Sequence, residues 1–185
     1  MTHGNPAMKF YTASITPGGL RVSGEVADGN IPIFMSPEKA DLMCKTVLDG
    51  MTKAGRPATL ENFDVAPHVK VRVGNDVQAL RDSCKPELAL YIGGMGSRGK
   101  NYYNDYARRL GYEEAAAKIQ DLYLDGKKDQ AAALVPDAMV DELALIGPKE
   151  RIKDRLDAWK QASRDHKVGT MILTAPLLSL LSINL

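Results

Sequence analysis

The chain has 185 residues, of which 44% are hydrophobic and 25% are charged, as expected of one globular domain and not of a disordered chain. Its 24 Lys and Arg against 23 Asp and Glu leave a net charge of +1, so no overall field attracts nucleic acid or an anionic membrane. No apolar run reaches the ~18 residues of a transmembrane helix. The start of the chain lacks the features of a signal peptide, and two cysteines in helical patterns, Cys44 and Cys84, are expected to be reduced and buried. These features predict a cytoplasmic protein.

The first 55 residues predict two pairs of a strand and a helix. Residues 8–14 are aromatic and β-favouring, and after a turn the apolar residues of 20–27 recur at helical spacing. A second apolar run, 31–35, has Pro32 at its centre, which makes a short strand or an edge strand. Ser36 and Pro37 then supply a helix cap and a first helical residue, so a helix is expected from Pro37 to about Ala54.

The rest of the chain predicts two more strands, separated by a long helical stretch. Residues 63–73 alternate strictly, with valines on one face and residues such as His68 and Lys70 on the other. A helix follows, and the chain from 101 to about 145 is helical throughout. Gly147-Pro148 opens another amphipathic helix, with Trp159 in its core, and 168–174 is the last strand. Strands that alternate with helices indicate a parallel α/β sheet, and four strands form either an open sheet or part of a barrel.

Several segments resemble the bacterial luciferase-like superfamily. They are 10–20 (FYTASITPGGL) with 24–29 (GEVADG), the strand from Asp64, and 145–152 (LIGPKERI). Residues 89–104 (ALYIGGMGSRGKNYYN) resemble the branch that uses the deazaflavin cofactor F420. The resemblance covers about residues 3–175. It implies an α/β fold that is the C-terminal half, strands five to eight, of a (β/α)8 TIM barrel. Residues 1–185 would form this single half-barrel domain, with a helical insertion at about 95–145 before the last strand.

The same resemblance implies an F420-dependent oxidoreductase that transfers a hydride between the deazaflavin and a small organic substrate. An FMN-dependent monooxygenase is the nearest alternative. A second alternative is a non-catalytic half-barrel, which would form a homo-oligomer or pair with a separate N-terminal half, and the apolar stretch 177–185 would suit such a partner contact. Catalytic residues are not assigned, because in the family much of the wall around the reactive ring comes from the other half.

The loop that follows the first strand is the main candidate for cofactor binding. It leaves the carboxyl end of a strand, its small residues let backbone N–H groups approach an anion, and a helix begins directly after it. The resemblance implies that this loop holds the cofactor's phosphate, mostly through the main chain. The residues included are Ala13, Ser14, Ile15, Thr16, Pro17 and Gly18.

A second candidate is the segment 94–101, GMGSRGKN, which matches a P-loop except at its last position. A P-loop needs a hydroxyl there to hold Mg²⁺, and Asn101 does not provide one, so nucleotide hydrolysis is not expected. Arg98 and Lys100 are retained as possible contacts to the acidic tail or phosphate of the cofactor. His68 has no partner at metal-ligand or catalytic-triad spacing and is interpreted as structural. The sequence therefore predicts no metal site, and the tyrosines of 102–106 are interpreted as packing residues.

Overall fold

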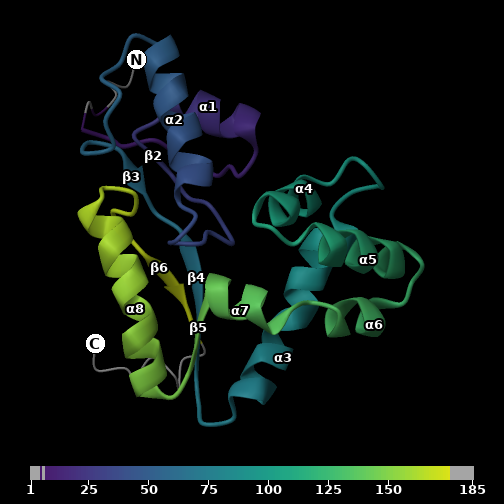
Figure 1. Ribbon diagram of the computed structural model, residues 1–185. Helices are drawn as coiled ribbons and strands as arrows, with labels where there is room; N and C mark the ends of the chain where they lie inside the picture. The colour runs from purple at the N-terminus through teal and green to yellow at the C-terminus, as the bar shows by residue number, and fades with distance from the viewer. Residues whose placement is uncertain (1–4, 6, 176–185) are drawn as a thin grey trace.

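The computed structural model describes residues 5 and 7–175, and it shows a parallel sheet flanked by helices on both sides (Figure 1). In Figure 1, α1 and α2 lie beside β2 and β3, α8 lies to the left of β4 and β6, and α3 to α7 lie to the right of β4. In chain order the elements are β1 (Tyr11–Thr12), α1 (Pro17–Val26), β2 (Gly29–Asn30), α2 (Asp41–Lys53), β3 (Asp64–Val65), β4 (His68–Val73), α3 (Val77–Ala89), the π-helical segment η1 (Leu90–Gly94), α4 (Tyr102–Arg109), α5 (Glu113–Leu124), α6 (Lys128–Ala133), α7 (Asp137–Leu143), β5 (Ala144–Gly147), α8 (Lys149–Arg164) and β6 (Ile172–Thr174).

All strand pairings are parallel, as the alternation of strands and helices predicts. One ladder has the order β1-β2-β3 and the other β5-β4-β6. β3 and β4 follow each other along one extended run, and a single bridge between Ile33 and His68 connects the chain after β2 to β4. The two ladders are therefore joined through residues 64–73.

The alternation of buried and more exposed side chains predicted along residues 68–73 is confirmed from His68 to Arg72. Val69 and Val71 are each 1% exposed, whereas His68 is exposed and Lys70 and Arg72 are half-buried. Trp159, expected in the core, is 2% exposed. One face of β4 therefore packs in the core, and the other presents polar side chains to the space beside α3 and α7.

The structure has six strands among the described residues instead of the four expected from the sequence. The predicted strand 63–73 is divided at Ala66-Pro67 into β3 and β4. Residues 144–147, predicted to be the end of a helical stretch, form β5 because their backbone pairs with residues 70–73 of β4. Helical periodicity cannot reveal this pairing, since the partner lies some seventy residues earlier in the sequence.

Two predicted elements begin or end elsewhere than the sequence suggested. The second strand is Gly29–Asn30 and not 31–35, because Pro32 has no N–H to donate to a ladder. The predicted helix from Pro37 begins only at Asp41, since Ser36 closes a turn through Lys39 N before α2 starts. Pro86 does not end α3: the helix continues through it and widens into η1 directly afterwards.

Helices α1 and α2 pack against each other at two glycines. A Cβ on Gly24 would lie 2.0 Å from Val47 O, and one on Gly50 would lie 2.0 Å from Arg21 O. Neither position can therefore hold a side chain without moving the helices apart. The close packing holds α1, and hence the loop before it, against the rest of the domain.

Both cysteines are buried thiols, as expected, Cys44 in α2 and Cys84 in α3. No helix within residues 5–175 is long and apolar enough to cross a membrane. The apolar stretch 177–185, considered above as a partner contact, lies outside the described residues.

Candidate functional site

Two hollows are candidates for a site. One lies between the start of α1, after the carboxyl end of β1, and helix α4. The other lies between β4 and the helices α3 and α7, beside the residues that follow β2 and the end of β6. Parallel α/β sheets bind ligands at the carboxyl ends of their strands, so the hollow after β1 is in the expected position for a site. The second hollow lies beside the middle of β4 and the start of β5, since Lys70 and Ala144 line it.

The first hollow, of about 640 Å³, joins the loop before α1 to helix α4. Thr16 caps α1, with its Oγ1 accepting a hydrogen bond of 3.1 Å from Gly19 N, and Pro17 is the first helical residue. The first turn of α1 carries no acidic residue. The positive end of the α1 dipole is therefore available to an anion in the hollow. The lining residues are Thr16, Pro17, Gly18, Tyr102, Asp105, Arg108 and Arg109.

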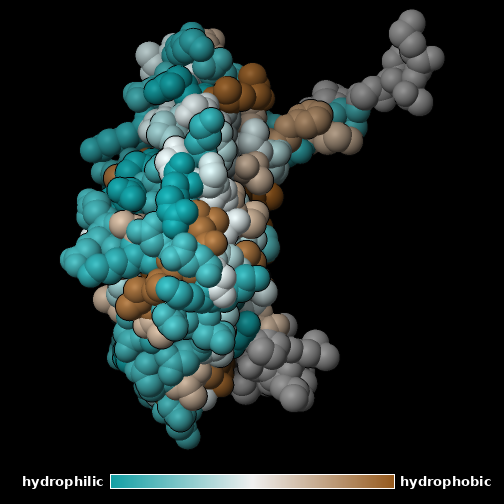
Figure 2. Space-filling view, turned by 90° about the vertical axis from the view of Figure 1, so that its right-hand side faces the viewer, coloured by the Kyte–Doolittle hydropathy of each residue, from teal (hydrophilic) through white to brown (hydrophobic). Residues whose placement is uncertain are grey.

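Two arginines of α4 supply the positive charge of this hollow. Arg109 donates a 2.8 Å hydrogen bond to Ile15 O, and its guanidinium lies 5.2 Å from the centroid of the Tyr106 ring. Arg108 Nε donates to Asn104 Oδ1 at 2.8 Å. Within the described part of the chain, neither guanidinium forms an ion pair with a carboxylate. The hollow thus combines a helix start with two arginines, against one carboxylate in its lining, Asp105. Figure 2 shows the face that carries α4 to α6 as largely hydrophilic with small hydrophobic patches.

The loop before α1 is held in shape by Asn30, whose side chain is 1% exposed. Its Oδ1 accepts from Ser14 N at 3.0 Å and from Thr12 Oγ1 at 3.1 Å, and its Nδ2 donates to Ser14 O at 3.0 Å. The amide therefore satisfies both backbone groups of Ser14 beyond the end of β1. A Cβ on Gly19, in the first turn of α1, would lie 1.9 Å from Ser14 Oγ, so a larger residue there would displace the Ser14 side chain.

The structure separates the six predicted loop residues into two groups. Thr16, Pro17 and Gly18 line the hollow. Ala13 and Ser14 precede it without lining it, and Ile15 is 6% exposed with its side chain in the core, so it contributes its carbonyl to Arg109.

Arg98 and Lys100 lie at the other end of α4, outside the hollow. Arg98 Nε donates to Asp121 at 2.8 Å and its Nη2 to Asp125 at 3.3 Å, while Lys100 is exposed in a tight turn closed by its N–H to Ser97 O. The eight residues of α4 separate this turn from Arg108 and Arg109 by about 12 Å. Arg98 and Lys100 line neither of the two hollows, so the structure gives no support to their predicted contact with a cofactor.

Asn101, the residue that breaks the P-loop pattern, is structural. Its Oδ1 accepts from the N–H groups of Tyr103 and Asn104, and its Nδ2 donates to the carbonyls of Tyr91 and Ile92. The segment before it is the end of α3 and η1, not the strand that a P-loop requires. The resemblance to a P-loop is therefore confined to the sequence.

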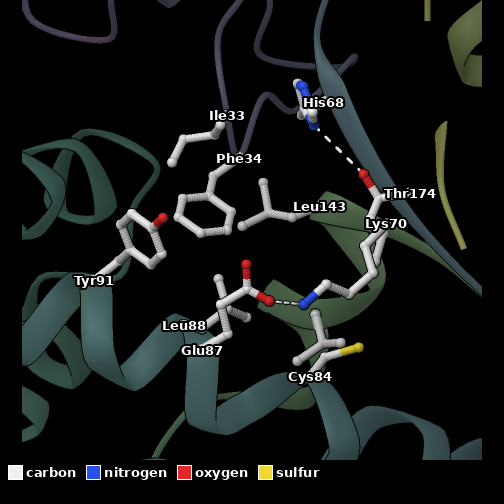
Figure 3. A pocket seen from close by; sticks show the side chains of 12 residues that line it. Ile33, Phe34, His68, Lys70, Cys84, Glu87, Leu88, Tyr91, Leu143 and Thr174 are labelled. Carbon is white, nitrogen blue, oxygen red and sulfur yellow. Dashed lines mark hydrogen bonds and ion pairs between the residues drawn. The ribbon is translucent and has the colours of Figure 1, made fainter. Parts of the chain in front are cut away.

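The second hollow is a mainly apolar cavity of about 380 Å³ (Figure 3). Phe34 forms part of its wall in a left-handed backbone conformation, with φ of 55°, which a bulky residue rarely adopts. Edge-to-face contacts hold its ring, with centroid distances of 5.1 Å to Tyr91 and 6.4 Å to Tyr103. The lining residues are Ile33, Phe34, His68, Lys70, Cys84, Glu87, Leu88, Tyr91, Val140, Leu143, Ala144 and Thr174.

Polar side chains that face this cavity include Lys70, Glu87, His68, Thr174 and the phenol of Tyr91. Lys70 of β4 forms an ion pair with Glu87 of α3, and burial lowers the pKa of the Lys70 ammonium. His68 Nδ1 lies 3.4 Å from Thr174 Oγ1. His68, interpreted from the sequence as structural, is thus exposed at the edge of a cavity and not enclosed in the core.

No sequence pattern indicated a role for Asn30, Phe34, Arg108 or Arg109. Asn30 is a lone amide between apolar residues, and the two arginines end a helix whose orientation only the tertiary structure defines. Among the tyrosines, Tyr106 is 2% exposed and packs as expected, whereas Tyr102 is 67% exposed and lines the first hollow.

The profile of the luciferase-like monooxygenase family matches residues 2–166. The chain belongs to this family. A Mycobacterium tuberculosis protein that is named as a coenzyme F420-dependent oxidoreductase is 31% identical over 159 residues, which are 86% of this chain and 45% of that protein. The 5,10-methylenetetrahydromethanopterin reductase of Methanopyrus kandleri is 24% identical over 154 residues, 83% of this chain and 42% of that enzyme. The chain spans less than half the length of either luciferase-like relative.

Solved structures of luciferase-like proteins share the fold. The F420-dependent tetrahydromethanopterin reductase of Methanopyrus kandleri has a TM-score of 0.64 at 20% identity, covering 92% of this chain and 46% of that one. An F420-dependent secondary alcohol dehydrogenase has a TM-score of 0.60 at 13% identity, covering 89% and 42%. The described parallel α/β fold thus corresponds to part of a luciferase-like TIM barrel.

Proposed function

We propose that this chain forms part of an F420-dependent oxidoreductase, which transfers a hydride between the deazaflavin and a small organic substrate. The observation that carries the proposal is the first hollow, where the start of α1 and two arginines surround space for an anion. The relatives named for coenzyme F420 support the choice of cofactor. When bound, F420 supplies a ring that accepts or donates a hydride, and the protein holds and aims it.

The residues present fit the phosphate of such a cofactor. A Cβ built on Gly18 meets no atom within 4 Å, so the backbone there is open to a ligand. Thr16 and Gly18 would hold the phosphate at the helix start, and Arg108 and Arg109 would neutralise its charge. Asn104 positions Arg108, and Asn30 positions the loop.

We further propose that the chain corresponds to strands five to eight of the family's barrel, with the helices between α3 and β5 as its insertion. The side chains that contact the substrate in the whole enzyme would then come partly from residues outside this chain. FMN also carries a phosphate, so the hollow alone does not favour F420 over FMN, and the test must compare them.

The test is a fluorescence titration of the purified chain with F420 and, separately, with FMN, with light scattering to measure its mass. Tighter binding of F420 than of FMN supports the proposal. Arg108→Gln should weaken F420 binding about tenfold through loss of a charge-assisted contact, whereas Arg98→Gln, whose side chain is paired with Asp121 and Asp125, should leave it unchanged. Equal loss in the two variants would contradict the assignment of the hollow.

A non-catalytic half-barrel that associates with a second copy is the second candidate. It is favoured by exposed apolar side chains around β1 and α1, where Phe10 is 65% and Val26 is 70% exposed. A stable dimer that binds neither cofactor would support this candidate in place of the first.

A further inference from the structure

Within the described residues, four strand positions lie side by side in the parallel sheet. β2 pairs with β1 on one side and with β3 on the other, and β3 continues into β4, which pairs with β6. β5 adds no fifth position, because it pairs with residues 70–73 of β4 beyond the bridge of Ile33 to His68, on the side where β2 lies. The order across the sheet is therefore β1, β2, β3 with β4, and β6, which is half the number of strands in a TIM barrel.

The two outer strands each have a free backbone edge. Thr12 O accepts a 2.7 Å hydrogen bond from the first N–H after β2, so the N–H and C=O of Tyr11 point away from β2. Ile172 N donates a 3.0 Å hydrogen bond to the chain between β3 and β4, so the N–H and C=O of Leu173 point away from β4. In the part of the chain that the structure describes, no strand lies against either edge. Such edges are templates for a further strand.

Exposed apolar side chains border the free edge of β1. Met8 is 57% and Phe10 is 65% exposed, and on α1 Val22 is 51% and Val26 is 70% exposed, one helical turn apart. Asp28, two residues beyond Val26, bonds both backbone groups of Phe10, so the end of α1 lies next to the start of β1. This edge therefore carries apolar surface of the kind that interfaces between chains cover.

A second copy of this chain has both of the edges that are needed. A two-fold rotation about an axis parallel to the strands keeps every strand parallel and brings β1 of each copy beside β6 of the other. The two contacts are identical and close on themselves, so no edge is left open. The length agrees, because the aligned region is 46% of the tetrahydromethanopterin reductase chain, and two copies match the extent of about one such barrel.

The shear of a TIM barrel predicts which residues would meet. The pairing register places Tyr11, Gly29 and Asp64 in one row across the sheet, and the register of β4 with β6, continued four residues back, ends this row at Val168. In a TIM barrel such a row is displaced by about eight residues in a full circuit, hence by about four over half of it. Tyr11 of one copy should then face Ile172 of the other, four residues beyond Val168 and inside β6.

The orientations of these two residues fit this register. Tyr11 Oη donates to Asp64 Oδ2 at 2.9 Å, and Thr170, two residues before Ile172, donates to the same oxygen at 2.9 Å. Residues two apart in an extended chain share a face, so Tyr11 and Ile172 project from the same face of the sheet. The backbone of Tyr11 points outward and that of Ile172 points toward β4, which is the alternation that a parallel ladder requires of two facing residues.

We propose that two copies of this chain close an eight-stranded parallel barrel, in which β1 of each copy pairs with β6 of the other. The inference rests on the proposed function, which assigns the chain to half of the family's barrel. The loop that lines the first hollow directly follows β1, so β6 of the second copy would end beside this loop and complete the wall of the hollow.

The mass of the full chain in solution is the first test, and it needs no variant. Light scattering at micromolar concentrations should give twice the mass of one chain. A monomer throughout that range would overturn the proposal, and so would an assembly larger than a dimer, because the two-fold contact closes on itself.

Two cysteine variants locate the contact. Tyr11→Cys and Ile172→Cys, unfolded and refolded together, should be joined by a short thiol-reactive cross-linker, since neighbouring strands lie about 5 Å apart. Either variant alone should not be joined, because the two-fold axis places the two copies of one position on opposite sides of the barrel. The native thiols Cys44 and Cys84 are buried.

The matched control is Tyr102→Cys with Ile172→Cys, since Tyr102 is also an exposed tyrosine, 67% exposed, but lies on α4. The first pair should yield at least about tenfold more covalent dimer than the control pair, because cross-linking requires facing positions. Circular dichroism verifies that each variant is folded. A wild-type dimer whose folded variants give no mixed cross-link, or as much in the control pair, would overturn the pairing of β1 with β6.

The F420 titration is run separately on the same protein. F420 binding by a chain that stays monomeric would reject this inference and leave the proposed function standing. A dimer with the predicted cross-link that has no affinity for F420 would reject the proposed function and retain the closed barrel.

Discussion

The two hollows beside the sheet differ in the side chains that line them. The hollow at the start of α1 is lined by a helix terminus and by side chains of α4, among them Arg108 and Arg109, which do not belong to the core. The cavity behind Phe34 is mainly apolar, and its lining includes core residues such as Cys84 and Leu88. Changes to the lining of the first should therefore alter ligand binding with little effect on stability, whereas changes in the second should alter both.

Asn30 is the exception to this contrast, because it is buried beneath the loop of the first hollow and supports both stability and ligand binding. Asn30→Ala would remove three hydrogen bonds and leave both backbone groups of Ser14 without their partner. We expect the free energy of unfolding to fall by about 2–4 kcal/mol and F420 binding to weaken strongly, the largest effect of the set. Chemical denaturation measures it. Asn75→Ala, at an exposed position, is the control, and a similar small loss in both variants would contradict the role of Asn30.

The ion pair in the cavity provides the second test. Glu87→Leu would leave the Lys70 ammonium, which is 20% exposed, without a counter-charge, and we expect it to cost about 1–3 kcal/mol. The double variant Lys70→Met with Glu87→Leu should recover most of that loss, because it removes both charges. A double-mutant cycle by denaturation measures the coupling, and additive losses would show that the two side chains do not interact.

The third test concerns the contacts that join α7 to α3 and α8 beside the cavity. Asp141 of α7 accepts hydrogen bonds from Arg81 of α3 and forms an ion pair with Arg151 of α8. Burial alone would raise the pKa of Asp141, but the two guanidiniums outweigh it and hold that pKa below its ordinary value of 3.8. Asp141→Asn should cost about 1–2 kcal/mol at neutral pH.

The pH dependence of that loss follows from the lowered pKa. The stabilisation is present above the ordinary carboxyl pKa and disappears as the pH falls through the lower value of the folded state. The difference between wild type and Asp141→Asn should therefore be constant from neutral pH to about pH 5 and shrink below pH 3.8. Denaturation curves across this range check it, and a constant difference down to pH 2 would contradict the proposed cause.

The smallest expected change in stability comes from a variant at Gly18, which separates the effect on ligand binding from the effect on stability most clearly. Gly18→Asp places a negative charge in the first turn of α1, which should raise the free energy of unfolding by about 0.3–1 kcal/mol while lowering F420 affinity at least tenfold. Gly18→Ala, whose Cβ enters open space, separates the effect of the added charge from that of losing glycine. If Gly18→Asp bound F420 as tightly as Gly18→Ala, the anion would not lie at this helix terminus.

Much of the sequence signature of the family serves structure in this chain. Gly24 permits the close packing of α1 on α2, and Asp28 accepts a hydrogen bond of 2.9 Å from Phe10 N. These residues place the loop and do not line the hollow. A motif can thus identify the family correctly while naming few of the residues that face a ligand.

Local patterns were sufficient where each element is determined by its own residues. The helical spacing of residues 20–27, the alternation along β4 and the apolar stripe of α8 were predicted, because pleating and helical periodicity act over a few residues. The same reasoning could not place β5, since its pairing with β4 joins segments far apart in the chain.

The facing surfaces of the two hollows depend on packing between distant elements. Arg108 and not Arg98 lies beside the loop because α4 points its carboxyl end toward Ile15. Phe34 lies across from Glu87 because the chain after β2 pairs with β4 at Ile33, and α3 lines the same cavity beside β4. Such contacts result from the burial of apolar surface over the whole domain, which no short segment specifies. The family and the loop before α1 could be recognised in the sequence. The positions of Arg108, Arg109 and the Asn30 amide, and the cavity itself, were decided by the tertiary structure.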